Sequence, residues 1–108
     1  MASEDFKEKA LQLVSLIDYQ KDSVVSKQLW EKKTGTLTLF TFDAGQSLSE
    51  HAAPYDATIL VIDGKAEILI GGKSHEVSAG QMIIMPANIP HAVKARERFK
   101  MLLIMIRS

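Results

Sequence analysis

The residues best suited to chemistry in this sequence are two histidines, His51 and His91. Imidazole titrates near neutral pH, so it can act as a general acid or base, and it can also donate and accept hydrogen bonds or bind a metal. The chain contains no cysteine. Disulfides, thiolate catalysis and zinc–thiolate sites are therefore excluded, and the two imidazoles become the starting point for any functional hypothesis.

Each histidine follows a turn at a fixed spacing. Five residues separate Gly45 from His51, and five separate Gly80 from Pro86, with His91 a few positions later. Together these segments resemble the two conserved motifs of the cupin superfamily. The matching positions are Gly45, His51, Asp63-Gly64, Gly80, Pro86 and His91. The resemblance covers roughly residues 37–107, and it implies an all-β, jelly-roll-like barrel of the double-stranded β-helix type, forming a single domain over residues 1–108.

The cupin resemblance also implies a four-ligand metal site, of which this chain retains two positions. His51 and His91 match ligand positions, whereas Ala53 and Ala57 stand where the family usually has a second histidine and a glutamate or glutamine. Redox-active and related transition metals normally need three or four nitrogen or oxygen donors. We therefore expect a degenerate metal site. A divalent transition metal would bind His51 and His91 only if other groups joined them, and we assign no cofactor.

Other side chains could supply the missing donors. Strand alternation from His51 predicts that Tyr55 lies on the same side, as an aromatic wall of the pocket or as a phenolate ligand. Asp56 would need a bulge to turn inward. Four methionines on expected strands could form a copper(I) site with the histidines, or they could simply be adaptable core packing. These methionines are Met82, Met85, Met101 and Met105.

Three functional hypotheses follow. The first is a small-molecule-binding protein with an apolar pocket, in which His51 and His91 form hydrogen bonds and Ala53, Tyr55 and Ala57 line the site. The second is a cupin enzyme of the metal-dependent oxygenase, isomerase or decarboxylase type. The third is a sensor module that acts through a partner protein. Alternatively, each histidine could be an interior residue satisfied by backbone carbonyls or water, without a chemical role.

The elements that must position these residues are short strands after one helix. Phe6, Ala10, Leu13, Val14 and Ile17 recur at helical spacing, which predicts a helix within residues 1–18 that begins at an N-cap, Ser3, and covers an open end of the barrel. The expected strands are 23–33, 36–43, 57–62, 65–70, 73–77, 81–85, 91–95 and 100–107. Thr34-Gly35 and Asp63-Gly64 predict hairpin turns.

Composition limits the partners and the location. The charge sums to zero, with 13 acidic and 13 basic residues, which argues against a general nucleic-acid binder or an anionic-membrane binder. No apolar run is long enough for a bilayer span or a signal peptide, so we expect a cytoplasmic protein. A chain of this size gains from dimerisation, and the apolar run 101–106 lacks alternation, so we expect a homodimer. Trp30 could wall the pocket or lie at a dimer interface.

Overall fold

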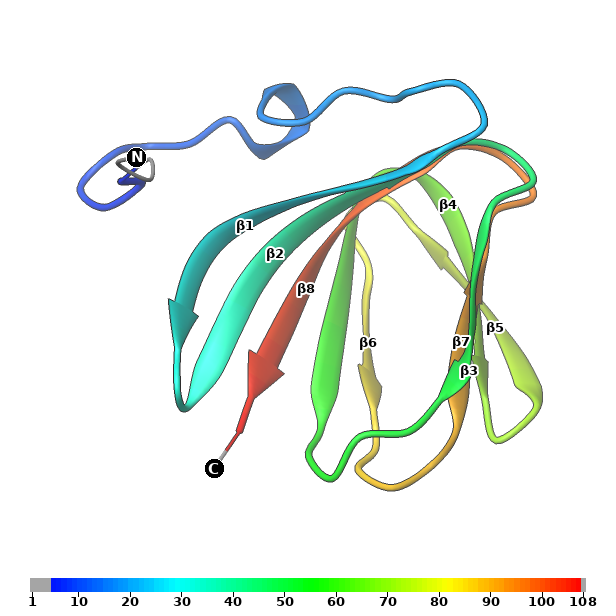
Figure 1. The fold of residues 1–108 in the computed structure, drawn as a ribbon. Coiled ribbons are helices and arrows are strands. Elements are labelled where there is room, and N and C mark those ends of the chain that lie inside the picture. The colour runs from blue at the N-terminus through cyan, green and yellow to red at the C-terminus, as the bar shows by residue number, and fades with distance from the viewer. Residues whose placement is uncertain (1–4, 108) are drawn as a thin grey trace.

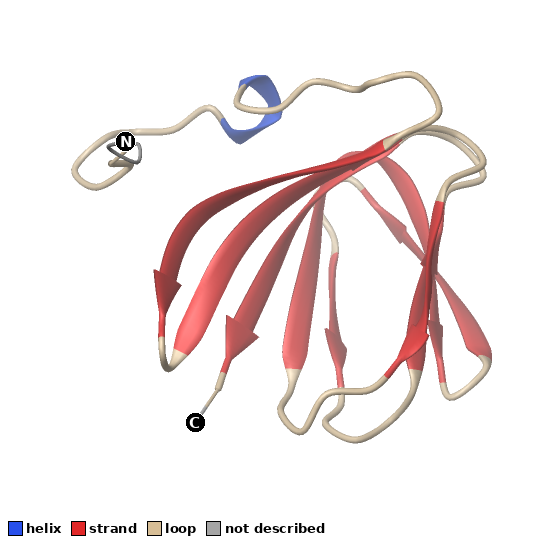
Figure 2. Ribbon diagram, viewed as in Figure 1, coloured by secondary structure: helices blue, strands red, loops and turns tan. Residues whose placement is uncertain are grey.

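The computed structural model describes residues 5–107 and contains eight strands and one 3₁₀ turn. The elements are η1 (Leu13–Ser15), β1 (Val24–Lys32), β2 (Gly35–Phe42), β3 (Ser47–His51), β4 (Ala57–Ile70), β5 (Lys73–Ser78), β6 (Met82–Met85), β7 (His91–Lys94) and β8 (Phe99–Ile106). Figure 2 shows that strands make up nearly all the regular structure. The predicted all-β fold is thus confirmed.

The strands form two sheets that share one strand. Sheet A contains β1, β2, β8, β6 and the first half of β4, and sheet B contains β3, β7, β5 and the second half of β4. All pairings are antiparallel. The two sheets face each other across the interior and form an open half-barrel of the double-stranded β-helix type (Figure 1). β1 and β3 are the two ends of the continuous strand order, β1-β2-β8-β4-β7-β3.

The hairpin predicted at Asp63-Gly64 is wrong, because β4 continues through these residues. The register between β4 and β8 shifts between Val61 and Asp63, which marks a β-bulge, and Gly64 has φ 73°. A Cβ atom at Gly64 would collide with the carbonyl oxygen of Arg98. Glycine is therefore required for a bend that carries the strand from one sheet into the other, rather than for a reversal of the chain.

The hairpin between β1 and β2 is present, but another strand escaped the sequence analysis. β1 and β2 pair from Val24–Phe42 to Lys32–Gly35, as the turn near Thr34-Gly35 predicted. β3 was not predicted, because SLSEH is polar and carries no run of β-branched or aromatic residues. The predicted and observed numbers of strands are nevertheless both eight, because the prediction missed β3 but divided β4 into two strands.

The prediction of an N-terminal helix is also wrong. Only Leu13–Ser15 forms a 3₁₀ turn, and the expected N-cap at Ser3 lies outside the described residues. Two local features oppose a helix here: the backbone N–H of Lys7 donates to Asp5 Oδ1 at 3.0 Å, and Glu8 has φ 60°. The segment packs on the outer face of sheet A, where Ile17 contacts the cluster of Leu39 and Leu102. It therefore covers one face of a sheet and not an end of the barrel.

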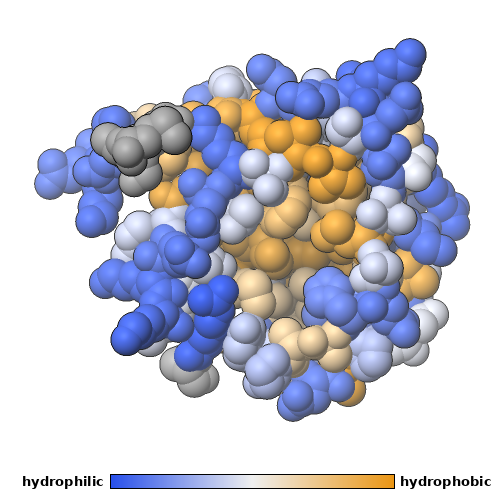
Figure 3. Space-filling view, in the orientation of Figure 1, coloured by the Kyte–Doolittle hydropathy of each residue, from blue (hydrophilic) through white to orange (hydrophobic). Residues whose placement is uncertain are grey.

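The interior between the sheets is tightly packed at one end and more exposed at the other. Phe42, Phe99 and Ile68 are completely buried. Further along the same strands, the inward-facing Phe40, Leu103, Met105 and Ile70 are only partly buried. Figure 3 shows apolar side chains at the centre of the face between the two sheets, surrounded by polar ones. The half-barrel thus has a closed end near Phe42 and Phe99 and an open end.

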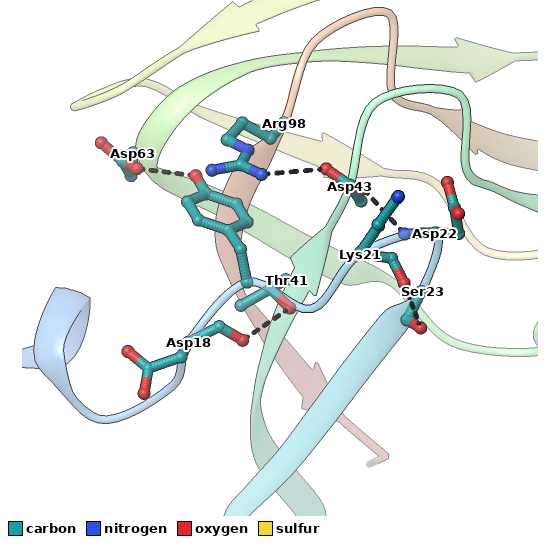
Figure 4. A network of polar contacts seen from close by, with 9 residues as sticks. Asp18, Lys21, Asp22, Ser23, Thr41, Asp43, Asp63 and Arg98 are labelled. Atoms are coloured by element: carbon teal, nitrogen blue, oxygen red, sulfur yellow. Dashed lines mark hydrogen bonds and ion pairs between the residues drawn. The ribbon is translucent and has the colours of Figure 1, made fainter.

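A polar network fastens the chain at the closed end (Figure 4). The Tyr19 hydroxyl donates to Asp63 Oδ2 at 2.6 Å, and Arg98 lies over the Tyr19 ring at 4.6 Å while pairing with Asp43 at 3.3 Å. The backbone N–H of Asp22 donates to the same Asp43 carboxylate at 2.8 Å. These contacts join the segment before β1 to the bend in β4 and to the loop before β8.

Candidate functional site

His51 and His91 face each other across two neighbouring strands. They form a register pair between the last residue of β3 and the first residue of β7, and their ring centroids lie 4.4 Å apart at an interplanar angle of 69°. His91 is buried, with 5% of its surface exposed, and His51 is exposed. Two residues forty positions apart are thus brought together, as the resemblance to the two cupin motifs led us to expect.

Both imidazoles are held by their own strands in the same way. His51 Nδ1 lies 3.0 Å from the carbonyl oxygen of Ser49, and His91 Nδ1 lies 3.3 Å from that of Ile89. A carbonyl oxygen can only accept, so each Nδ1 must carry the proton. In the neutral ring Nε2 then has a free lone pair. The pair therefore offers two acceptor atoms, one on each ring.

The surroundings of His91 favour its neutral form. Burial lowers the pKa of His91 below its ordinary value of 6.5, and the neighbouring His51 lowers it further, because two imidazolium charges so close together repel. The contact with the carbonyl of Ile89 acts in the opposite direction but is the weakest of the three causes. At neutral pH His91 is thus a hydrogen-bond acceptor or a base, and not a cation.

The other predicted site residues lie near this end of the barrel. Ala57, at the start of β4, is buried and belongs to the inner core, whereas Ala53 lies in the loop after β3. The carbonyl oxygen of Ala53 accepts from the N–H of Asn88 at 2.7 Å, and Asn88 has φ 66°. This loop contact places the segment after β3 beside the connection that leads to His91.

Tyr55 and Asp56 differ in their surroundings. The Tyr55 ring is half-buried and lies under the Arg107 guanidinium, whose central carbon is 5.9 Å from the ring centroid. Asp56 is exposed, and its Oδ1 accepts from the N–H of Ala87 at 2.8 Å. The Asp56 carboxylate thus holds two loops together.

The four methionines do not form one cluster. Met82 is 62% exposed, and its register partner Leu60 belongs to the outer apolar cluster, whereas Met85 and Met101 are buried in the interior. Met85 and Met105 are both register partners of Ala57, on its two sides. The interior methionines therefore surround the alanine with apolar contacts, as expected of core packing.

The donor set at this end is small for a metal of the kind the cupin resemblance implies. Within residues 5–107, no group of three or more histidine, cysteine, aspartate or glutamate side chains is arranged to hold an ion. Two imidazoles and two alanine methyl groups fall short of the three or four donors that such a metal requires. These residues by themselves do not fit such a metal.

Sequence reasoning missed Arg107, which follows β8 at the open end. Its guanidinium lies over Tyr55, and its Nε is buried without a hydrogen-bond partner among the described residues. The available signal was alternation along 99–107, which places Arg107 on the same side as Phe99, Met101 and Met105. The surrounding apolar run concealed this signal.

A family model described as the cupin domain matches residues 38–107. The chain therefore belongs to the cupin domain family. Within it, this protein is a small conserved-barrel cupin, as the comparison with solved structures shows.

Three solved structures are similar over most of this chain. A conserved protein of unknown function from Streptococcus pyogenes is 37% identical with a TM-score of 0.88, covering 94% of this chain and 89% of that one. A cupin 2 conserved barrel domain protein from Leptotrichia buccalis is 41% identical with a TM-score of 0.86, covering 89% and 47%. A cupin superfamily protein from Desulfitobacterium hafniense is 29% identical with a TM-score of 0.89, covering 98% and 97%.

An uncharacterised protein from Streptomyces coelicolor is 27% identical over 64 residues, and the matched part spans 59% of this chain and 61% of that protein. The chain thus aligns with less than two thirds of this curated relative. Among the described residues, no helix has the length and apolar character needed to cross a bilayer.

Proposed function

We propose that this protein binds a small molecule at the open end of the barrel, with His51 and His91 as its polar contacts. The observation that carries the proposal is the shared anchoring of both Nδ1 atoms to backbone carbonyls. This anchoring fixes the tautomers and leaves two Nε2 acceptors.

The apolar surroundings support the same proposal. Inward-facing Phe40, Leu103, Met105 and Ile70 are only partly buried at this end, so a ligand could cover apolar surface that the protein leaves exposed. Small-molecule sites are mostly apolar with a few placed polar groups. The ligand expected here has an apolar body and a polar end.

A ligand screen by thermal shift tests the proposal. A bound compound should raise the melting temperature of the wild-type protein and of His75→Ala, which removes an imidazole of β5 that is not part of the His51–His91 ring contact. The double variant His51→Ala, His91→Ala should lose most of this shift. The proposal fails if a broad screen finds no stabilising compound, or if the double variant responds like the wild type.

An acid–base enzyme is the second candidate, because the lowered pKa of His91 keeps a neutral base at the site. Such an enzyme would take a proton from a bound substrate at His91 Nε2. Elemental analysis of protein purified without added metal separates this candidate from a metal-dependent one. One equivalent of tightly held iron, manganese, nickel or copper would show that the ligand set extends beyond the two histidines.

We also propose that the protein forms a homodimer through the outer face of sheet A. Three large apolar residues on this face are strongly exposed: Met82 at 62%, Ile84 at 54% and Ile106 at 62%. They continue the half-buried outer positions of Leu60 and Ile104. The N-terminal segment covers another part of this face, where a groove of about 830 Å³ is lined by Phe6, Leu11 and Trp30.

Light scattering at micromolar concentration tests the dimer. The wild-type protein should have twice the monomer mass, and Ile84→Lys combined with Ile106→Lys should be a folded monomer. Ile89→Lys is the matched control. Ile89 is also exposed, at 40%, but it lies in the connection between β6 and β7 and not on the outer face of sheet A. A monomeric wild-type protein would contradict the proposal.

A further inference from the structure

Arg107 occupies an inward position at the open end of the barrel. Along β8 the inward residues are Phe99, Met101, Leu103 and Met105, all of which belong to the inner core cluster or pack against it. The N–H of Arg107 donates to the carbonyl oxygen of Thr34 at 2.6 Å, so the ladder with β2 continues beyond the end of β8. The next inward side chain in this alternation is that of Arg107.

The position of Tyr55 supports the inward direction of Arg107. β4 and β8 pair Ala57 with Met105, and extending this antiparallel register by two residues brings Tyr55 opposite Arg107. The guanidinium lies over the Tyr55 ring, 5.9 Å from its centroid. The two side chains are therefore in contact just beyond the Ala57–Met105 pair, on the side of the sheet that faces the interior.

Within residues 5–107, Arg107 differs from Arg96 and Arg98 in having no carboxylate partner. Arg96 pairs with Glu67 at 3.0 Å, and Arg98 pairs with Asp43 at 3.3 Å. Arg107 Nε is buried and has no hydrogen-bond partner among residues 5–107. The Arg107 side chain as a whole is half-buried, and an Arg–carboxylate pair in such a partly shielded place forms two parallel charge-assisted hydrogen bonds.

The arginine and the histidine pair lie at the same end of the fold. In Figure 1 the end of β3, the start of β7, the start of β4 and the end of β8 all lie at the lower end of the half-barrel. The imidazole pair and one cation thus lie at the end where inward apolar side chains are only partly buried. This combination favours a ligand with a single negative charge over a dianionic phosphate, which would need more donors than one guanidinium provides.

From this arrangement we infer that Arg107 is an anion-recognition residue, and that the ligand is a small carboxylate with an apolar body whose carboxylate pairs with Arg107. The inference rests on the proposed binding function of the histidine end and names its ligand class. The apolar body covers the exposed inner side chains, and any hydroxyl or N–H on it donates to Nε2 of His51 or His91. The Tyr55 ring contacts the guanidinium and helps to hold it in place.

The test compares ligands that differ only in the polar end. Straight-chain carboxylates from butanoate to octanoate, the matching amides and hexyl phosphate are titrated against wild-type protein by calorimetry. The best carboxylate should bind about tenfold tighter than its amide, as a charge-assisted pair would give, and tighter than hexyl phosphate. Arg107→Gln should reduce carboxylate binding to the level of the amide and leave amide binding unchanged.

Two further variants keep the test decisive. Arg96→Gln is the matched control, because Arg96 is an exposed arginine on the outside and should bind carboxylates like the wild type. Arg107→Lys retains the charge but not the planar fork, and it should show an intermediate affinity even if Arg107→Gln folds poorly. Equal binding of carboxylate and amide, a preference for hexyl phosphate, or an unchanged Arg107→Gln would overturn the inference.

These outcomes also separate the inference from the proposed function. If carboxylates and amides bind equally and both require His51 and His91, the binding function stands and the role of Arg107 falls. If no member of the series binds while another class of compound binds through the histidines, the ligand class is wrong. If nothing binds at the histidine end, both proposals fall.

Discussion

The two ends of the half-barrel are built from the same strands but by opposite means. At the closed end, Phe42 and Phe99 stack with centroids 4.6 Å apart and are fully buried, and Tyr19 and Arg98 each pair with a carboxylate. At the open end several inward apolar side chains are only partly buried, and Arg107 Nε has no hydrogen-bond partner among the described residues. The contrast indicates that stability is concentrated at one end and that the other is left able to bind.

The largest effect should come from removing an aromatic ring at each end. Phe99→Ala is expected to lower the free energy of unfolding by about 3–5 kcal/mol, because the ring is fully buried. Phe40→Ala, nearer the open end and only partly buried, should cost roughly half as much. Urea unfolding measures both. Equal losses would mean that packing does not differ between the two ends.

The bend in β4 gives the next largest effect. Gly64→Ala places a methyl group against the carbonyl of Arg98 at a positive φ, and should cost roughly 2–5 kcal/mol. Gly72→Ala is the matched control, since Gly72 also has a positive φ, 81°, but no atom lies within 4 Å of an added Cβ. It should cost only about 1–2 kcal/mol in the same unfolding experiment. A similar loss in both variants would show that the clash is relieved at little cost.

Removing a single hydroxyl compares the two tyrosines. Tyr19→Phe loses the 2.6 Å hydrogen bond to Asp63 at the closed end and should cost about 1 kcal/mol. Tyr55→Phe, whose ring contact with Arg107 is retained, should change stability by less than about 0.5 kcal/mol. Thermal melts of both variants and of the wild-type protein measure the two losses of stability. A larger loss at Tyr55 would reverse the assignment of the stabilising end.

The smallest effect concerns pH, and it has a different window at each end. The folded pKa of His91 lies below its unfolded value of 6.5, so the unfolded state takes up the proton first and stability falls as the pH drops through that value. The pKa of Asp43 is lowered from 3.8, chiefly by the N–H of Asp22, so its contribution is present above that value and disappears in stronger acid.

Melting temperatures measured from about pH 7 to about pH 5 isolate the histidine effect, since Asp43 stays ionised there. His91→Gln should flatten this part of the curve, and His75→Gln should leave it unchanged. If His91→Gln follows the wild-type curve, burial of His91 has no consequence for acid stability.

The sequence identified the cupin fold and the histidine pair through its resemblance to the two conserved motifs of the cupin superfamily. The matching positions include both histidines, and the register between β3 and β7 pairs His51 with His91, although β3 itself was not predicted. Local reasoning failed where a distant partner decides the outcome. Taken alone, Asp63-Gly64 is a strong hairpin signal. In the fold, β4 stays extended because it pairs with β8 up to Gly64 and with β5 from Lys65 onward.

The site itself was only partly predictable for the same reason. The anchoring of each Nδ1 to a carbonyl depends on backbone geometry at the strand ends, and the lone Arg107 becomes evident only when β4 and β8 are placed in register. Apolar spacing at the N-terminus suggested a helix, but the segment instead packs through Ile17 on the outside of sheet A. Tertiary contacts thus decided these features.

The continuity of β4 has a consequence for how the molecule comes apart. Residues 57–64 pair with β8, and residues 65–70 pair with β5, so a single strand contributes ladder hydrogen bonds to both sheets. Neither sheet can open fully without releasing a strand that the other sheet also uses. Slow amide hydrogen exchange should therefore report one cooperative unit, with the N–H groups of Ile59 and Ile68 exchanging through the same global opening and β1 and β3 opening separately at lower free energy.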